Sequence, residues 1–134
     1  MEKQIVVSGR RKNAVAKARI RKGIGKINFN KISYLDLMIF HKLSLQEPVE
    51  ICKHILGNFD FDIEIGASGG GKEAQVEAGR QAIAKALVKF TGSAELRKAF
   101  LEYDRRIIIA DTRRKETRKP GDSKARAMRQ TSYR

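Results

Sequence analysis

The sequence has little of the side-chain chemistry on which enzymes and secreted domains depend. Its 134 residues contain one cysteine, two histidines, two prolines and no tryptophan. A single cysteine excludes an internal disulfide, and the apolar neighbours of Cys52, Ile51 and Ile55, predict a small core residue. Cys52 and His54 stand two positions apart on a predicted helix and do not share a face, so a zinc site is not supported. We therefore predict no metal site and no cofactor, and we expect His41 and His54 to be surface or boundary residues.

Long hydrophobic runs are also missing. No apolar run approaches the roughly 18 residues of a membrane span. Neither end of the chain has the Trp, Phe or Leu face of an interfacial helix, which disfavours a membrane partner. The first residues, 1–4, lead into a short Ile-Val-Val strand and not into an apolar signal region of about 7 to 15 residues. We therefore expect a cytoplasmic protein with no membrane contact.

Positive charge is in excess, and it gathers at the two ends of the chain. The formal net charge is +14. Residues 1–26 hold nine bases and one acid, residues 27–110 hold eleven of each, and residues 111–134 hold nine bases and three acids. Lys and Arg at phosphates release condensed counterions, so a neutral middle with two cationic ends indicates a polyanionic partner such as nucleic acid.

The last 24 residues predict a tail that cannot form a core. Its only bulky non-ionic side chains are Met128 and Tyr133, and Pro120-Gly121 interrupts any helix. Fully extended, this segment could reach roughly 80 Å. About 110 residues remain for one folded domain. We therefore predict a globular domain over residues 1–110 and an extended basic tail over residues 111–134; a disordered solubilising tail is the alternative.

A basic β-hairpin is predicted near the N-terminus. Residues 4–9 are rich in β-branched side chains and lead into a predicted turn, Gly9-Arg10-Arg11-Lys12-Asn13. The next strand alternates with period two, which puts four apolar residues on one face (Ala14, Ala16, Ala18 and Ile20) and three cations on the other (Lys17, Arg19 and Arg21). The cations indicate a phosphate-contacting surface, with a simply solvated strand face as the alternative.

Two helices and a strand are predicted in the middle of the chain. Ser33 would cap a short helix through Phe40, with Asp36 as its capping-box partner, and a second helix would run from Glu47-Pro48 to Leu56. Gly57-Asn58 would end it. The following strand alternates apolar residues (Phe59, Phe61, Ile63 and Ile65) with acids (Asp60, Asp62 and Glu64). If it lies beside the basic strand, the acids would neutralise part of the positive row.

The clearest predicted helix covers residues 72–90. One face forms a core stripe (Val76, Gly79, Ile83, Ala86, Leu87 and Phe90), and the opposite face is polar (Glu77, Gln81, Lys85 and Lys89). Gly79 indicates a close approach to the sheet. Thr91-Gly92 would end this helix, Ser93 would cap another through about Glu102, and Ile107-Ile108-Ile109 would form a last strand.

The stretch from Gly66 to Glu73 nearly matches a nucleotide-binding loop, but it fails at its last position. Glu73 stands where a hydroxyl should meet magnesium, and its charge would repel phosphates. We interpret the three glycines before Lys72 as a tight turn that lets the positive end of the helix face a phosphate of a larger ligand. The carboxylates form no specific acid-base pair. The sequence thus predicts no enzyme and no small-molecule substrate.

Several ordered motifs together resemble one family. They are residues 8–16 (SGRRKNAVA), the turn at 69–71 leading to Gln75, residues 80–87 (RQAIAKAL), residues 111–114, residues 119–121, Ala125-Arg126, and the ending Gln130-Thr131-Ser132-Tyr133-Arg134. The chain resembles the ribosomal protein S-nine family, the ninth protein of the small subunit, nearly end to end. The Ser-Tyr-Arg ending is similar to the archaeal and eukaryotic-type branch. The tail departs from the family pattern at Thr112, Thr117, Asp122 and Met128.

This resemblance implies a fold, a location and partners. The implied fold is α+β, a two-layer sandwich of a mixed sheet and helices like the second domain of ribosomal protein S-five. The implied place is the head of the small subunit, on the 3′ major domain of its ribosomal RNA and beside other ribosomal proteins. The tail would thread toward the peptidyl-site transfer RNA, and its tip (Ser132, Tyr133 and Arg134) would approach the anticodon stem-loop.

The predicted ribosomal RNA contacts combine the basic hairpin, the start of the long helix and the tail. They are Arg10, Arg11, Lys12, Lys17, Arg19, Arg21, Lys72, Arg113, Arg114, Lys115, Arg118, Lys119, Lys124, Arg126 and Arg129. A structural RNA-binding protein of the ribosome is the leading hypothesis. A free RNA chaperone or regulatory RNA binder is the second, and a nucleotide-using enzyme is a distant third.

Overall fold

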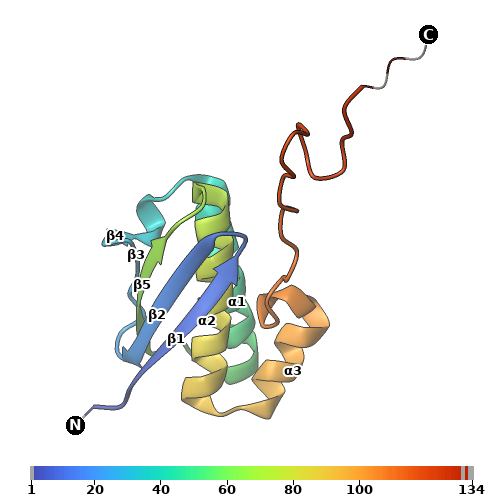
Figure 1. The fold of residues 1–134 in the computed structure, drawn as a ribbon. Helices are drawn as coiled ribbons and strands as arrows, with labels where there is room; N and C mark the ends of the chain where they lie inside the picture. The colour runs from blue at the N-terminus through green and yellow to red at the C-terminus, as the bar shows by residue number, and fades with distance from the viewer. Residues whose placement is uncertain (1, 131, 133–134) are drawn as a thin grey trace.

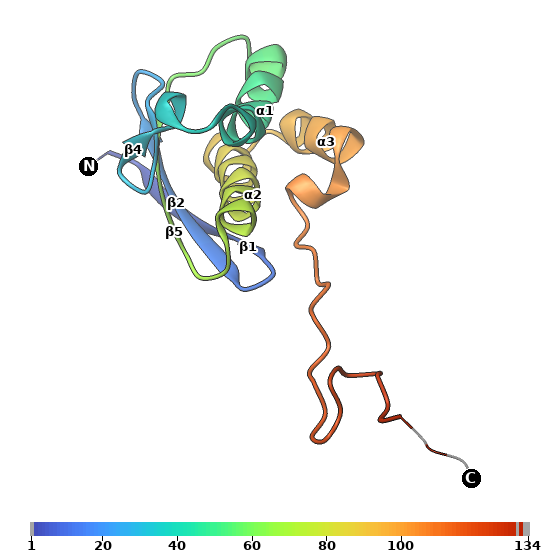
Figure 2. The same ribbon diagram turned by 90° about the horizontal axis from the view of Figure 1, so that it is seen from above.

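The computed structural model describes residues 2–130 and 132, which form an α+β fold with a mixed five-stranded sheet and three α-helices. In chain order the elements are β1 (Gln4–Arg11), β2 (Ala14–Lys22), β3 (Ile27–Phe29), β4 (Ile32–Ser33), α1 (Ile39–Leu56), β5 (Phe61–Ser68), α2 (Lys72–Thr91) and α3 (Ala94–Tyr103). The strand order is β1-β2-β5-β3-β4, with β3 parallel to β5 and the other pairs antiparallel. The helices cover one face of the sheet and leave the other open (Figures 1 and 2). The predicted α+β class is confirmed.

Strand β2 has the alternation that its sequence predicted. Its inward residues (Ala14, Ala16, Ala18 and Ile20) are fully buried, and its cations point to the open face. The hairpin turn, however, was placed too early. Strand β1 continues through Arg10 and Arg11, and the turn consists of Lys12 and Asn13, with Lys12 at a φ of 52°. Pairing with Val15 and Ala14 keeps the two arginines in the strand.

Gly9 therefore lies within β1, where it brings the strand against the backbone of α2. A Cβ atom at Gly9 would collide with the carbonyl oxygen of Ala78 and would lie 2.8 Å from the backbone nitrogen of Ala82. Beside it, the Arg10 N–H donates to Gln81 Oε1 at 2.8 Å. Gln81 is only 3% exposed. The prediction that Gln81 lies on the solvent face of α2 was wrong, because its amide pairs a strand N–H at the helix–sheet contact.

The rest of α2 follows the prediction. The helix ends at Gly92, whose φ of 66° suits a left-handed cap. The predicted stripe is buried, apart from Phe90, which is partly exposed. Gly79 makes a close approach, since a Cβ atom there would lie 2.9 Å from the Phe29 ring and 3.4 Å from Leu45. This glycine therefore makes room for both β3 and α1.

The segment before β5 differs from the prediction. Residues Tyr34–Asp36 form a single 3-10 turn, Ser33 lies in β4 and makes no side-chain cap, and one helix of 18 residues replaces two. Pro48 is inside α1 and fully buried. Proline often marks a first helical turn, but burial in the core offsets its lost hydrogen bond here. The predicted end of this helix is confirmed, because α1 stops at Leu56 and Gly57 follows in a left-handed conformation with a φ of 81°.

The two histidines have different environments. His41 is 7% exposed, and its Nε2 lies 2.8 Å from Glu73 Oε1, so the side chain links α1 to α2. The prediction of a surface or boundary residue was wrong for His41, whereas His54 is exposed. Cys52 is fully buried, as predicted, and burial raises the pKa of its thiol to about 11.

The predicted last strand does not form. Ser93 caps α3 as expected, since its Oγ accepts the Leu96 N–H at 3.2 Å. Beyond α3, residues Arg105–Ile107 form a 3-10 turn that begins at Asp104, whose Oδ1 accepts the Arg106 N–H. Ile107 is fully buried against the helices. A short apolar run can be buried by side-chain packing alone, so its composition did not require strand pairing.

Candidate nucleic-acid interface

The open face of the sheet carries the predicted row of exposed cations on β2, namely Lys17, Arg19 and Arg21. Strand β5 lies beside β2 and sets Glu64 opposite Arg19 and Asp62 opposite Arg21. Arg21 Nε lies 3.9 Å from Asp62 Oδ2. The cross-strand acids thus offset part of the positive row, as the sequence predicted. Lys17 instead has Gly66 as its register partner, so no acid stands directly across from it.

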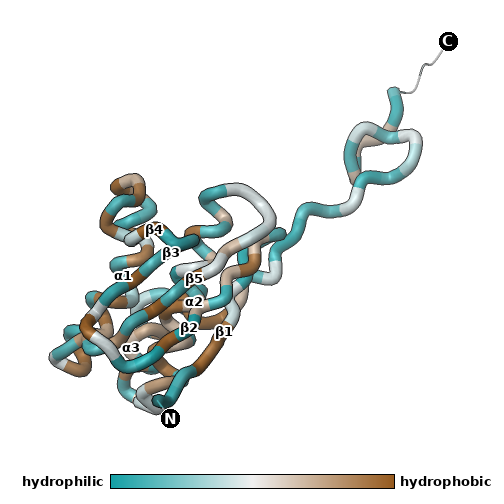
Figure 3. The backbone as a smooth tube through the Cα atoms, turned by 90° about the vertical axis from the view of Figure 1, so that its left-hand side faces the viewer, coloured by the Kyte–Doolittle hydropathy of each residue, from teal (hydrophilic) through white to brown (hydrophobic). Residues whose placement is uncertain are grey.

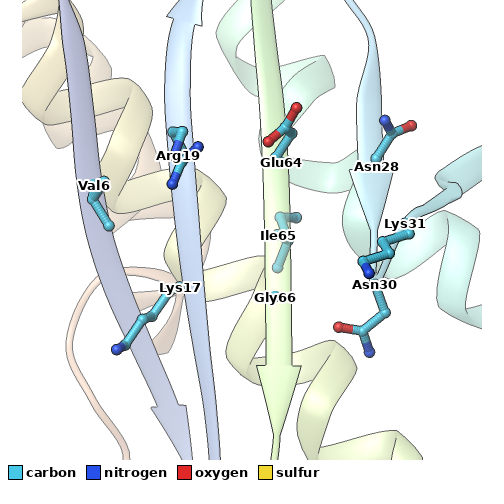
Figure 4. Close-up of a pocket in the computed structure, with 9 residues that line it drawn as sticks. All are labelled: Val6, Lys17, Arg19, Asn28, Asn30, Lys31, Glu64, Ile65 and Gly66. Carbon is cyan, nitrogen blue, oxygen red and sulfur yellow. The ribbon is translucent and has the colours of Figure 1, made fainter.

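A groove of about 680 Å³ opens over this face (Figure 4). Its floor includes Ile65 and Gly66 of β5, and a Cβ atom at Gly66 would meet nothing within 4 Å. Lys17 and Arg19 lie on one side of β5 and Lys31 on the other (Figure 4). The remaining lining residues are Val6, Asn28, Asn30 and Glu64. Cations on both sides, with the amides of Asn28 and Asn30 on the Lys31 side, suit phosphate and sugar groups, whereas Glu64 on β5 lies between the cations (Figure 4).

Sequence reasoning missed the β3–β4 side of this groove. Asn30 is fixed there, because its Oδ1 accepts the Ala67 N–H at 2.8 Å and its own N–H donates to the Ile65 carbonyl at 2.8 Å. Asn30 and Lys31 have positive φ angles of 50° and 68°, which turn the chain from β3 into β4. Strands of three and two residues are too short to show a period of two. The only available signal was an asparagine at a turn.

Asp62, which stands opposite the last cation of β2, Arg21, also has a structural role. Its Oδ1 accepts backbone N–H groups from Ile24 at 3.0 Å, Gly25 at 3.2 Å and Lys26 at 3.1 Å. These hydrogen bonds, that from Lys26 foremost, hold the pKa of Asp62 below its ordinary value. The carboxylate thereby orders the loop between β2 and β3 and cannot be regarded only as a counter-charge to Arg21.

The hairpin tip and the start of α2 meet at one end of the sheet. Gly69 and Gly70 have φ angles of 76° and 59°, and a Cβ atom at Gly69 would lie 2.5 Å from the Asn13 carbonyl oxygen. The glycine turn therefore packs against the hairpin, and the predicted tight turn is confirmed. Lys12 and Lys72 flank this contact and are exposed. The fold thus brings together two predicted RNA contacts that are 60 positions apart.

The Asp111 carboxylate joins the tail to the body by binding Arg11 and Arg113, and we call these three residues the carboxylate hub. Asp111 is 8% exposed, and its Oδ2 accepts from Arg11 Nη1 at 2.9 Å and from Arg113 Nη2 at 2.7 Å. Hydrogen bonds from Arg113, followed by the charges of Arg113 and Arg11, hold the pKa of Asp111 far below its usual range. Arg11 Nε also donates to Glu77 of α2. Arg11 and Arg113 are therefore engaged by acids, whereas the neighbouring Arg10 side chain is exposed.

Beyond this hub the chain leaves the body. Residues 112–119 have no helix or strand, and the segment runs away from the helices (Figures 1 and 2). The predicted tail contacts are all exposed there: Arg114, Lys115, Arg118, Lys119, Lys124, Arg126 and Arg129. Two acids pair locally, Glu116 with Arg126 at 2.8 Å and Asp122 with Arg129 at 3.8 Å. Ser132 is exposed, and Tyr133 and Arg134 lie outside the described residues.

Within residues 2–130 and 132, no three His, Cys, Asp or Glu side chains come together as a metal site would require. In the same part of the chain, no helix combines the length and apolar character needed to cross a membrane.

A small α+β body with an open cationic face and a long basic extension is typical of proteins that bind nucleic acid. Comparison with known proteins narrows this class. The model of the family described as ribosomal protein S9/S16 matches residues 9–134. The chain belongs to this family, as the sequence motifs predicted.

Three archaeal relatives show how far the similarity extends. The chain is 44% identical over 130 residues to small ribosomal subunit protein uS9 of Methanococcus vannielii, covering 94% of this chain and 95% of the relative. It is 45% identical to uS9 of Methanococcus maripaludis strain C7 with the same coverage. With uS9 of Methanothrix thermoacetophila the identity is 36% over 129 residues, 95% of this chain and 96% of the relative. The similarity therefore includes both the body and the tail.

Proposed function

We propose that the chain is a structural constituent of the small ribosomal subunit, where it binds ribosomal RNA through the open sheet face, the hairpin end and the tail. Family membership supports the ribosomal assignment. The distribution of charge supports the RNA contact: residues 27–110 have no net charge, while the ends contribute the whole excess of +14. Such cations favour binding to a phosphate backbone, because neutralising the phosphates releases condensed counterions.

The geometry suggests different roles for the predicted contacts. Lys17, Lys12 and Lys72 are exposed and without a paired acid among the described residues, so they are the body's strongest candidates for phosphate contacts. Arg11 and Arg113 hold Asp111 and thereby position the first residues of the tail. The exposed tail cations would then meet RNA along a path set by this hub. Lys31, Asn28 and Asn30 extend the proposed contact across the groove.

We infer that the body resembles the second domain of ribosomal protein S-five and lies in the head of the small subunit, beside other ribosomal proteins of a cytoplasmic ribosome. The tail, residues 111–134, would extend toward the peptidyl-site transfer RNA. Its reach of roughly 80 Å is enough to enter crevices that the body cannot. Ser132, Tyr133 and Arg134 would meet the anticodon stem-loop by hydrogen bonding, stacking and phosphate binding.

A matched pair of charge reversals tests the RNA contact. Lys17→Glu reverses one charge on the open sheet face. Lys98→Glu reverses one charge on α3, on the helical side of the body. Both lysines are exposed, so neither substitution should affect folding. Filter binding of the full-length protein to the 3′ major domain of small-subunit ribosomal RNA should show weaker affinity for Lys17→Glu, with a salt slope smaller by about one. Equal losses for the two variants would refute binding through the sheet face.

Sedimentation distinguishes the ribosomal role from that of a free RNA chaperone. In a lysate of the source cells, a structural constituent should co-sediment almost entirely with small subunits and complete ribosomes. A predominantly free pool that still binds RNA would favour the chaperone instead. The measurement requires only an antibody to the chain and a sucrose gradient at physiological salt, because high salt would strip contacts made by cations.

A further inference from the structure

Large apolar side chains are left exposed where the chain passes from β4 into α1. We call them the apolar patch, and their exposed fractions lie between 50% and 74%: Ile32, Leu35, Met38, Ile39, Phe40 and Leu43. Figure 3 shows brown, hydrophobic backbone at this end of the molecule, near β4 and α1. Soluble domains usually scatter exposed apolar residues singly, whereas a cluster of them marks an interaction surface.

Helix α1 shows that this exposure is local. Its inward face is buried from His41 and Leu45 to Cys52. On the outward face, Ile39 and Leu43 are four positions apart and share a stripe. Farther along, that stripe becomes polar, at Gln46, Glu50 and Lys53. Only the first turns of α1 therefore present apolar side chains to the outside, and these continue directly into the residues of the preceding turn.

The apolar patch is also held in place. His41 links the first turn of α1 to Glu73 of α2 at 2.8 Å. Tyr34 and Leu37, which alternate with patch residues, pack against the core. The short β3–β4 pairing fixes Ile32 opposite Phe29. A surface that is already ordered loses little conformational freedom on binding, which favours a specific partner.

The charge of the patch limits what can cover it. Residues 32–43 contain one acid, Asp36, and one lysine, Lys42, so the segment has no net charge with His41 neutral. Phosphates would find few cations here, in contrast to the open sheet face. A second copy of the chain would bring a further charge of +14 and repel the first. The tail offers only Met128 as a bulky apolar side chain among its described residues, and it leaves the body near α3 (Figure 1).

We propose that the apolar patch docks onto an apolar surface of a neighbouring protein in the small ribosomal subunit. This inference rests on the proposed function, because the assembled subunit supplies such a neighbour. The protein then has two separate interfaces: cations on the open sheet face and tail meet RNA, and Phe40 with its neighbours meets protein. Phe40, the most exposed member at 74%, is the expected centre of the contact.

Photocrosslinking in assembled subunits tests the proposal. Benzoylphenylalanine replaces Phe40 in the full-length chain, which is expressed in cells and purified in small subunits. A matched control carries the same replacement at Ile24, which is 77% exposed and lies in the β2–β3 loop at the other end of the sheet. After irradiation, we expect the position-40 probe to attach to one small-subunit protein identified by mass spectrometry. The position-24 probe should not attach to that protein.

Three results would overturn the inference: crosslinks from position 40 mainly to ribosomal RNA, no crosslink from position 40, or the same protein attached from both positions. The variant Phe40→Asp gives an independent measurement. It should keep the melting temperature and the RNA affinity of the wild-type chain but enter subunits about tenfold less well in competition with it. Unchanged competition would count against the patch. Lost RNA affinity of Phe40→Asp at an unchanged melting temperature would also count against the patch as a separate protein interface. Failure of the wild-type chain to sediment with subunits would instead count against the proposed function.

Discussion

The contact between Gly9 and α2 allows a quantitative test of how the hairpin is positioned. The substitution Gly9→Ala places one methyl group against backbone atoms of Ala78 and Ala82, at distances that real Cβ atoms do not show. Backbone cannot rotate away as a flexible side chain can, so β1 and α2 must separate. The Arg10–Gln81 hydrogen bond, 2.8 Å long, spans the same contact and should weaken with it.

The expected loss of stability can be estimated from two opposing effects. Overpacking costs about 1–3 kcal/mol, and the short distances to backbone place Gly9→Ala near the upper end. Alanine also reduces the entropy of the unfolded chain, which offsets about 0.4–1 kcal/mol. We therefore expect a net loss of about 2 kcal/mol. For a chain of this size the melting temperature should fall by about 8 °C, and the urea midpoint by about 1 M.

The control is Gly66→Ala, another glycine in a strand of the same sheet. A Cβ atom at Gly66 meets nothing within 4 Å, so this variant should be as stable as the wild type or slightly more stable. Urea unfolding of the full-length proteins, followed by circular dichroism, measures both. Equal stability of the two variants would show that β1 and α2 are not in contact at Gly9 and would refute the overpacking argument.

Four further outcomes are expected. If about six to ten cations contact phosphates, the affinity for ribosomal RNA should fall by about 10³ to 10⁵ between 50 and 200 mM salt on a duplex-DNA scale, and salt-independent binding would contradict the proposed contact. Gly79→Leu should destabilise the body by about 1–3 kcal/mol or more, because the added side chain meets Phe29 and Leu45; an unchanged melting temperature would contradict this packing. The lowered pKa of Asp62 means that its contribution is present above the unfolded value near 3.8 and is lost as pH falls through the lower folded value. Asp62→Ala should therefore reduce stability at neutral pH and flatten the loss on acidification, as chemical unfolding at a series of pH values would show. Deletion of residues 132–134 should leave subunit incorporation intact and weaken peptidyl-site transfer RNA binding by about 1–3 kcal/mol at most; unchanged filter binding of transfer RNA would make the tip a passive anchor.

The sequence by itself determined the local elements that have a clear period. The alternation of β2 and the stripe of α2 are each set by side chains close together in the chain, so the burial of Ala16 or Ile83 could be predicted without knowing the fold. Charge segregation likewise follows from composition. The motif order indicated the family, and the match over residues 9–134 confirmed it.

Only the tertiary structure decided which distant residues share a site. Arg11 and Asp111 are 100 positions apart, and no local pattern indicates that they form an ion pair. Gln81 was predicted on the solvent face and His41 at the surface or boundary, but both side chains are buried, and each has a hydrogen-bond partner that only the packed fold supplies. Similarly, the groove depends on β5 lying between β2 and β3. The periodicity of a segment predicts which of its faces is apolar. Long-range packing determines which residues contact that face and which buried polar groups form hydrogen bonds with one another.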